Sequence, residues 1–265
     1  MKLSKKIIYG IFIFIGIGLF FFYFLQEKFL FLPGKRLSKN VVFDFPKPFT
    51  EVNLKAKDGE TLNALHFILE KPKGIVLFFH GNKGNLERWG KIVPYLLEYD
   101  YEVFVMDYRN YGKSTGSFNE KTMYQDAITV YEHVKKSYTE DKIVVYGRSL
   151  GSTFAARVGA TFNPKHVVLE APFYNMKRAT QFYFPLSPVF LLKYTFRTDN
   201  DVPKITSPIT FFHGDEDRTT SFKGSNELFT LVTSSQKEFV EIPTATHHNV
   251  KDFPIYKQKM KAILD

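Results

Sequence analysis

Ser149 stands between two glycines, at the point where an apolar segment gives way to a segment of small residues. Residues 143–146 are apolar and β-branched, as in a strand buried on both faces, and residues 152–160 are small enough to pack closely as a helix. Residues 147–151 read Gly-Arg-Ser-Leu-Gly, a G-x-S-x-G pattern. In a strand-to-helix elbow the serine is strained, and a side chain on Gly147 or Gly151 would clash with its neighbours. We therefore interpret Ser149 as a nucleophile held by an elbow.

The elbow also predicts how negative charge would be stabilised. It would place the Ser149 hydroxyl at the amino end of a helix, where the partial positive charge favours a developing oxyanion. The backbone N–H of Leu150 would donate to that oxyanion. The alternative is an ordinary glycine-rich turn, which the flanking strand and helix disfavour.

Apolar strands alternate with helical segments after residue 50. Residues 50–69 alternate apolar and polar residues around Asp58-Gly59, which predicts a hairpin with one solvated face. Further strands are expected at "GIVLFFHGN", "EVFVMD", "HVVLEAPF", "SPITFFHGDED" and "EFVEIP", with helices at residues 86–97, 121–136 and 152–160, in "FKGSNELFTLV" and from Asp252. This alternation predicts an α/β fold with a mostly parallel sheet covered by helices on both faces.

Composition excludes some classes of function. The chain has 265 residues, and 36 Lys and Arg against 27 Asp and Glu give a net charge of +9. The cations are scattered, without the stripe of interleaved aromatics that binding to single strands requires, so we expect no nucleic-acid partner. The absence of cysteine excludes disulfides and thiolate chemistry.

The amino-terminal segment predicts a membrane anchor. Residues 7–25 form an uncharged apolar run about as long as a bilayer core is thick, preceded by Lys2, Lys5 and Lys6. A cleaved signal peptide would have a shorter core and small residues before the cut, so an uncleaved single-pass helix is expected. Cations on the two sides nearly balance, with a slight preference for the amino terminus inside. The segment "EKFLFLPGKRL" is typical of the membrane interface.

Five motifs together resemble the α/β-hydrolase superfamily, in its membrane-anchored serine hydrolase branch. They are "HGN", "DYRNYGKS", "GRSLG", "HGDED" and "HHN", in that order along the chain. The resemblance implies an anchor at residues 1–28 and an α/β-hydrolase domain at residues 29–265. It also implies a small helical cap at about residues 171–205, a segment rich in aromatics and prolines.

The resemblance implies a catalytic triad in the order nucleophile, acid, histidine. Ser149 matches the nucleophile, and the acid matches Asp217 in "HGDED", with Asp215 a less favoured alternative. Thr219-Thr220 stands where the family usually has Val-Pro, which leaves the shape of this loop open.

The histidine is one of two neighbours, and only one of them can face Asp217, because adjacent residues in an extended loop point in nearly opposite directions. The resemblance favours His248, since the family's histidine is usually followed by a small polar residue, here Asn249. His247 would then lie at the rim or face solvent.

The resemblance also implies a second oxyanion donor and several structural residues. The donor is the backbone N–H of Asn82, facing that of Leu150, with Gly81 allowing close approach. Histidines at strand ends, His80 and His213, are expected to hold loops. The first residues of the 107–114 loop, Asp-Tyr-Arg, are expected to be structural.

These residues predict a membrane-anchored serine hydrolase that cleaves an ester or thioester through an acyl-enzyme and needs no cofactor. A small-molecule or lipid-like acyl substrate is expected, since the site would lie beside an anchor and an apolar cap. The cap could bind an acyl chain or simply close over the core. One alternative is a metal-dependent hydrolase using His80, Asp107, His213 and a terminal histidine. Another is a non-catalytic anchored interaction protein. The sequence does not predict the oligomeric state or the side of the membrane.

Overall fold

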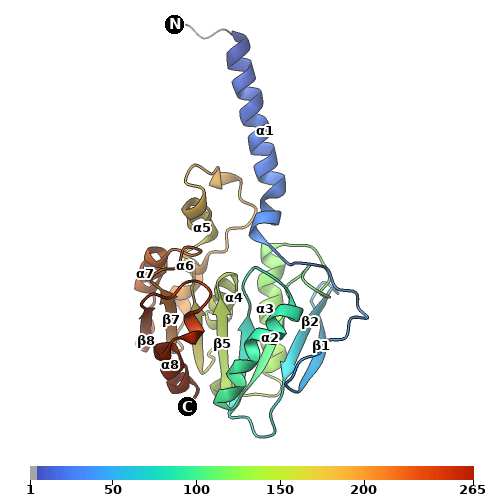
Figure 1. Cartoon of the computed structure of the whole chain (residues 1–265), viewed down its shortest axis with the longest axis vertical. Helices are drawn as coiled ribbons and strands as arrows, with labels where there is room; N and C mark the ends of the chain where they lie inside the picture. Colours follow the sequence, from blue (N-terminus) through green and yellow to red (C-terminus); the bar gives the residue numbers. More distant parts are fainter. Residues whose placement is uncertain (1–4) are drawn as a thin grey trace.

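The strands of the domain form a single twisted sheet (Figure 1). The structure is a computed structural model that describes residues 5–265. The strands are β1 (Phe49–Lys55), β2 (Thr61–Phe67), β3 (Gly74–Phe79), β4 (Tyr101–Met106), β5 (Ile143–Arg148), β6 (His166–Glu170), β7 (Ile209–Gly214) and β8 (Lys237–Ile242). Their order across the sheet is β1-β2-β4-β3-β5-β6-β7-β8.

Most neighbouring strands run parallel, as the sequence predicts. The β1–β2 hairpin around Asp58-Gly59 is antiparallel, and β2 pairs antiparallel with β4. From β4 to β8 every pair is parallel. The carboxyl ends of β3, β5 and β7 therefore meet at one edge, and these strands lead into the motifs around Asn82, Ser149 and Asp217.

Helices cover both faces of the sheet. They are α1 (Lys5–Leu30), α2 (Leu86–Ile92), α3 (Glu120–Val134), α4 (Leu150–Gly159), α5 (Met176–Tyr183), α6 (Thr198–Asp201), α7 (Phe222–Thr230) and α8 (Pro254–Leu264). Leu77 and Phe79 of β3 belong to the core that includes α3 and α4, whereas Val76 and Phe78 belong to the core that includes α2 and α8. This alternation follows from the two-residue period of a strand.

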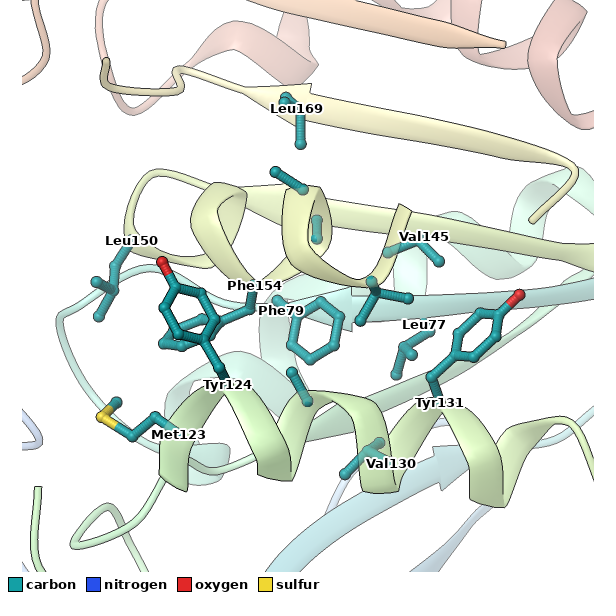
Figure 2. Close-up of a cluster of buried hydrophobic side chains, with 14 of the residues drawn as sticks. Leu77, Phe79, Met123, Tyr124, Val130, Tyr131, Val145, Leu150, Phe154 and Leu169 are labelled. Atoms are coloured by element: carbon teal, nitrogen blue, oxygen red, sulfur yellow. The ribbon is translucent and has the colours of Figure 1, made fainter. Parts of the chain in front are cut away.

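Aromatic side chains fill the core beneath the elbow (Figure 2). Phe154 of α4 is fully buried, and its ring lies near the rings of Phe79, Tyr108 and Tyr124. Tyr124 of α3 hydrogen-bonds Thr153 of α4 through the hydroxyl groups at 2.8 Å. These contacts hold the first turns of α4 against β3 and α3.

The helix expected at residues 86–97 is shorter than predicted. It ends at Ile92 and continues as a 3₁₀ segment over Val93–Tyr99. Pro94 lies at this junction and has no N–H to continue the α-helical hydrogen bonds. The amino end is capped as expected of Asn, since the side chain of Asn85 accepts a hydrogen bond from the Glu87 N–H at 3.0 Å.

The loop after β4 is structural, as the sequence predicts. The Arg109 guanidinium donates to Asp126 at 2.8 Å and to Asp58 at 2.6 Å, which links α3 to the β1–β2 hairpin. The Tyr108 hydroxyl donates to the His80 carbonyl at 2.6 Å. Asn110 has a positive φ of 62°, a conformation that Asn tolerates better than most residues.

Helix α1 projects away from the sheet and carries the expected apolar run (Figure 1). The helix is long and apolar enough to cross a membrane, and no residue of its most apolar stretch is buried against the domain. Its last turns nevertheless contact the domain: Gln26 is only 4% exposed, and Phe31, just after the helix, is 2% exposed. The helix thus continues beyond residue 28, where the sequence places the end of the anchor.

The cap segment was expected to be helical, but only part of it forms helices. Helix α5 spans Met176–Tyr183, a 3₁₀ turn spans Val189–Leu191, and α6 spans only Thr198–Asp201. In Figure 1 the α5 region stands beside the base of α1, at the same end of the domain. Cap and anchor therefore lie together above the carboxyl ends of the strands.

We expect Phe154→Ala to destabilise the domain by about 3–5 kcal/mol, because it removes a fully buried ring and leaves a cavity. Thermal unfolding in detergent, followed by circular dichroism, should show a midpoint lower by roughly 6 °C or more. Phe12→Ala is the matched control, since Phe12 is 68% exposed on α1. Equal midpoints for the two variants would contradict this role of Phe154.

Candidate active site

The elbow has the geometry that its sequence predicts. Ser149 lies between β5 and α4 with φ 52° and ψ −116°, a strained conformation for a residue with a side chain. A Cβ added to Gly151 would lie 1.9 Å from the carbonyl oxygen of Phe79, and one added to Gly147 would lie 2.4 Å from that of Gly151. Both glycines are therefore required by the close contact of α4 with β3 and β5.

Asp217 is a buried carboxylate surrounded by donors. Its Oδ1 accepts from the backbone N–H groups of Thr219 and Thr220 at 2.7 and 2.8 Å. Its Oδ2 accepts from the Thr220 hydroxyl at 2.8 Å and from His247 Nδ1 at 2.8 Å, and His213 Nε2 lies 3.3 Å away. Burial opposes ionisation of Asp217, but the hydrogen bonds from His213 and His247 outweigh it and hold its pKa well below the usual range.

The expectation that Asp217 holds His248 is wrong, because the structure pairs Asp217 with His247. His247 is 7% exposed and donates through Nδ1 to Asp217, whereas His248 is exposed. The rings of the two histidines are nearly perpendicular. The pKa of His248 is lowered by burial and by neighbouring positive charge, including Arg148 and Arg88.

Two contacts orient His247 toward Asp217. Asn249 Oδ1 accepts from the Thr246 N–H at 2.7 Å, which closes a tight turn around the histidines. The Arg148 guanidinium donates to the His247 carbonyl at 2.6 Å and to Glu170 at 2.7 Å. Arg148 is the residue before Ser149, so it ties the histidine loop directly to the elbow.

Asp215, the alternative acid, has another role. Its carboxylate accepts from the Thr244 N–H at 2.7 Å and so supports the turn that leads to the histidines. The Thr219-Thr220 pair also has a role that the sequence did not predict. The hydroxyl of Thr220 supports Asp217, and both threonines line the cavity at Ser149.

A cavity of about 480 Å³ opens at Ser149. That volume is typical of pockets for small ligands. Asn82 and Leu150, the expected oxyanion donors, lie on its wall with Ser149. The rest of the wall comes from the cap, from the loop after β7 and, unexpectedly, from α1. It comprises Phe22, Gln26, Phe29, Leu30, Phe173, Met176, Ala179, Thr180, Tyr183, Phe184, Ser187, Leu192, Thr219 and Thr220.

Hydrogen bonds from two other segments of the chain hold the loop that contains Asn82. The Asn82 carbonyl accepts from the Tyr111 hydroxyl at 2.7 Å and from the Leu32 N–H at 3.1 Å. The Asn82 side chain donates to the Leu30 carbonyl at 3.3 Å. The segment that follows the anchor thus supports the loop that carries one of the two proposed oxyanion donors.

The strand-end histidines His80 and His213 contact loops, and the candidate metal ligands do not converge. Buried His80 donates through Nδ1 to the Gly81 carbonyl at 2.7 Å, and its Nε2 lies 3.3 Å from Asp107. Burial raises the pKa of Asp107, although His80 acts in the opposite direction. His213 instead adjoins Asp217. Among residues 5–265, no three His, Asp or Glu side chains are placed to bind one metal ion.

Comparison with known proteins supports the fold. The family "Serine aminopeptidase, S33" matches residues 70–193. Esterase Pf2001 of Pyrococcus furiosus has the same fold, with a TM-score of 0.69 at 19% identity over 88% of this chain and 97% of that one. This chain therefore has the α/β-hydrolase fold.

Curated relatives of this chain include a membrane protein and a lipase. The membrane protein YNL320W of Saccharomyces cerevisiae is 26% identical over 94% of this chain and 92% of its own length. The lysophosphatidylserine lipase ABHD12 of Xenopus tropicalis is 25% identical over 69% of this chain, which spans 53% of the lipase. The apolar helix α1 and the likeness to the yeast membrane protein support a single-pass membrane protein.

We expect His247→Ala to reduce ester hydrolysis at least about 10⁴-fold, because the imidazole that Asp217 orients is lost. His248→Ala is the matched control and should keep at least roughly a tenth of the activity, since its side chain is exposed. Initial rates with a soluble p-nitrophenyl ester provide the measurement. An inactive His248→Ala beside an active His247→Ala would overturn the assignment.

Thr220→Val should lower the turnover of the same ester about fivefold, because Asp217 loses one hydrogen bond of about 1 kcal/mol. Thr220→Ser restores the hydroxyl and should recover most of the rate. A valine variant as active as the wild-type hydrolase would show that this hydroxyl has no part in positioning the acid.

Proposed function

We propose that this α/β-hydrolase is a serine hydrolase that cleaves a carboxylic ester or thioester through an acyl-enzyme. The observation that carries the proposal is the strained elbow serine, which lines a cavity together with Asn82 and Leu150. The hydrogen bond between Asp217 and His247 supplies the other half of a triad. The lipase among its relatives supports a lipid-like ester.

Each residue has a defined role in the proposed acylation step. Asp217 is ionised and accepts the Nδ1–H of His247, so Nε2 of the neutral ring carries the lone pair of a general base. Ser149 Oγ attacks the carbonyl carbon while its proton moves to Nε2. The carbonyl π electrons move to oxygen, where the N–H groups of Asn82 and Leu150 stabilise the oxyanion.

Collapse of the tetrahedral intermediate re-forms the carbonyl and breaks the bond to the alcohol or thiol. The leaving group takes the proton from His247, and the acyl group remains on Ser149. Water then attacks the acyl-enzyme, giving its proton to His247, and release of the acid returns that proton to Ser149. Positive charge on His247 during these steps is stabilised by Asp217, whose low pKa keeps it ionised.

Ser149→Ala should reduce hydrolysis of p-nitrophenyl esters by roughly four to six orders of magnitude while the fold is retained. A fluorophosphonate probe should label the wild-type protein at Ser149 and leave the variant unlabelled. Ser152→Ala is the matched control, since Ser152 is buried and its hydroxyl donates to the Ser149 carbonyl at 2.6 Å, away from the cavity wall.

Wild-type protein that neither reacts with the probe nor hydrolyses any ester of the series would contradict the proposed function. That result would favour the non-catalytic interaction protein. A matched pair of ester and thioester with the same acyl chain would decide which leaving group is preferred.

A further inference from the structure

One face of the anchor helix forms part of the cavity that contains Ser149. Phe22, Gln26, Phe29 and Leu30 all line this cavity, and their spacing places them on one side of α1. Phe20 lies on the opposite side of the helix and is 57% exposed. The anchor therefore contributes a wall to the candidate active site as well as a membrane span.

The cavity wall extends into the membrane-spanning part of α1. Phe22 lies within the apolar run of residues 7–25, three residues before its end. At 1.5 Å per residue, this places Phe22 about 4.5 Å inside the hydrocarbon boundary. If this run spans the hydrocarbon core, the opening between α1 and the cap would lie near the border between headgroups and acyl chains.

The cap presents apolar side chains at the same end of the molecule. Phe184, Leu186 and Phe190 are 60%, 99% and 78% exposed, and Phe29 of α1 is 69% exposed. The cap stands beside the base of α1 in Figure 1. Because α1 continues into the bilayer, these side chains are placed to enter the same membrane surface rather than to face water.

Hydrogen bonds hold the cap against the anchor. Gln26 accepts from the Lys193 N–H at 2.7 Å and donates to the Leu191 carbonyl at 3.2 Å. The Tyr194 hydroxyl donates to Glu27 at 2.7 Å. The α1 wall of the cavity is therefore fixed in place, and its residues can determine which chain fits.

We propose that the acyl chain of the substrate enters from the bilayer along α1, and that Phe22 is a specificity-determining residue for long chains. The inference rests on the proposed hydrolase activity. The substrate class is a membrane-resident ester with a long hydrocarbon chain. Its chain packs against the α1 face while its carbonyl reaches Ser149 at the headgroup level.

The test uses the full-length protein in lipid nanodiscs with p-nitrophenyl acetate and p-nitrophenyl palmitate. The measured quantity is the ratio of kcat/KM for palmitate to that for acetate. Phe22→Ala should lower this ratio at least fivefold, because the chain loses an apolar contact. Phe20→Ala, which changes the same residue type on the lipid-facing side, should stay within twofold of the wild-type ratio.

A second pair of variants keeps the test decisive if an alanine variant fails to fold. Phe22→Trp narrows the cavity and should shift the preferred ester to a shorter chain, whereas Phe20→Trp should leave the preference unchanged. Acetate hydrolysis and fluorophosphonate labelling show that each variant is folded. Active Phe22 variants that match the Phe20 variants in chain preference would overturn the inference and leave the proposed function standing.

Entry from the bilayer is tested by where the palmitate ester is placed. Ester in the same nanodisc as the enzyme should be hydrolysed at least tenfold faster than ester confined to separate vesicles. Equal initial rates would contradict entry along α1. A wild-type protein that neither hydrolyses acetate nor reacts with the probe would instead contradict the proposed function. The inference would then fail with it.

Discussion

The contact between Gly151 and the carbonyl of Phe79 is the constraint on which the site depends. It brings the first turn of α4 so close to β3 that no Cβ fits between them. The chain can make this approach only by turning sharply at Ser149, whose positive φ is the result. The buried aromatics around Phe154 hold α4 in this position, so the core stabilises a strained residue that local preference alone would not keep.

The charged groups around the elbow form a second layer of support. Arg148 is the last residue of β5 and precedes Ser149. Its guanidinium donates to Glu170 and to the backbone carbonyl of His247. Asp217 then fixes the ring of His247. The position of the histidine loop is thus set from two sides, at its backbone and at its side chain. Such double support is what a general base needs, because its nitrogen must be held within hydrogen-bond reach of the nucleophile.

The segment that follows the anchor helix contacts both the core and the loop that contains Asn82. The chain leaves α1 through Phe31, which stacks on Phe118 in the core with ring centroids 4.2 Å apart. Leu32 then pairs with the loop that contains Asn82. The membrane span, the cap and the loop behind the proposed oxyanion donors are therefore one connected unit. This arrangement fixes the position of the site relative to α1.

Local patterns in the sequence determined the strand-to-helix elbow, the parallel sheet and the apolar run. Each depends on residue types at short spacing: small residues at a forced contact, period-two strands and an uncharged run. The structural role of Arg109 was implied by the resemblance to the α/β-hydrolases. The tertiary structure alone decided which of two adjacent histidines faces Asp217, because that choice depends on the phase of a turn set by Asn249 and Arg148. It also decided that α1 forms a wall of the cavity. The α1 residues of this wall lie more than a hundred positions before Ser149. Residue spacing along the sequence therefore cannot predict that they meet at one cavity.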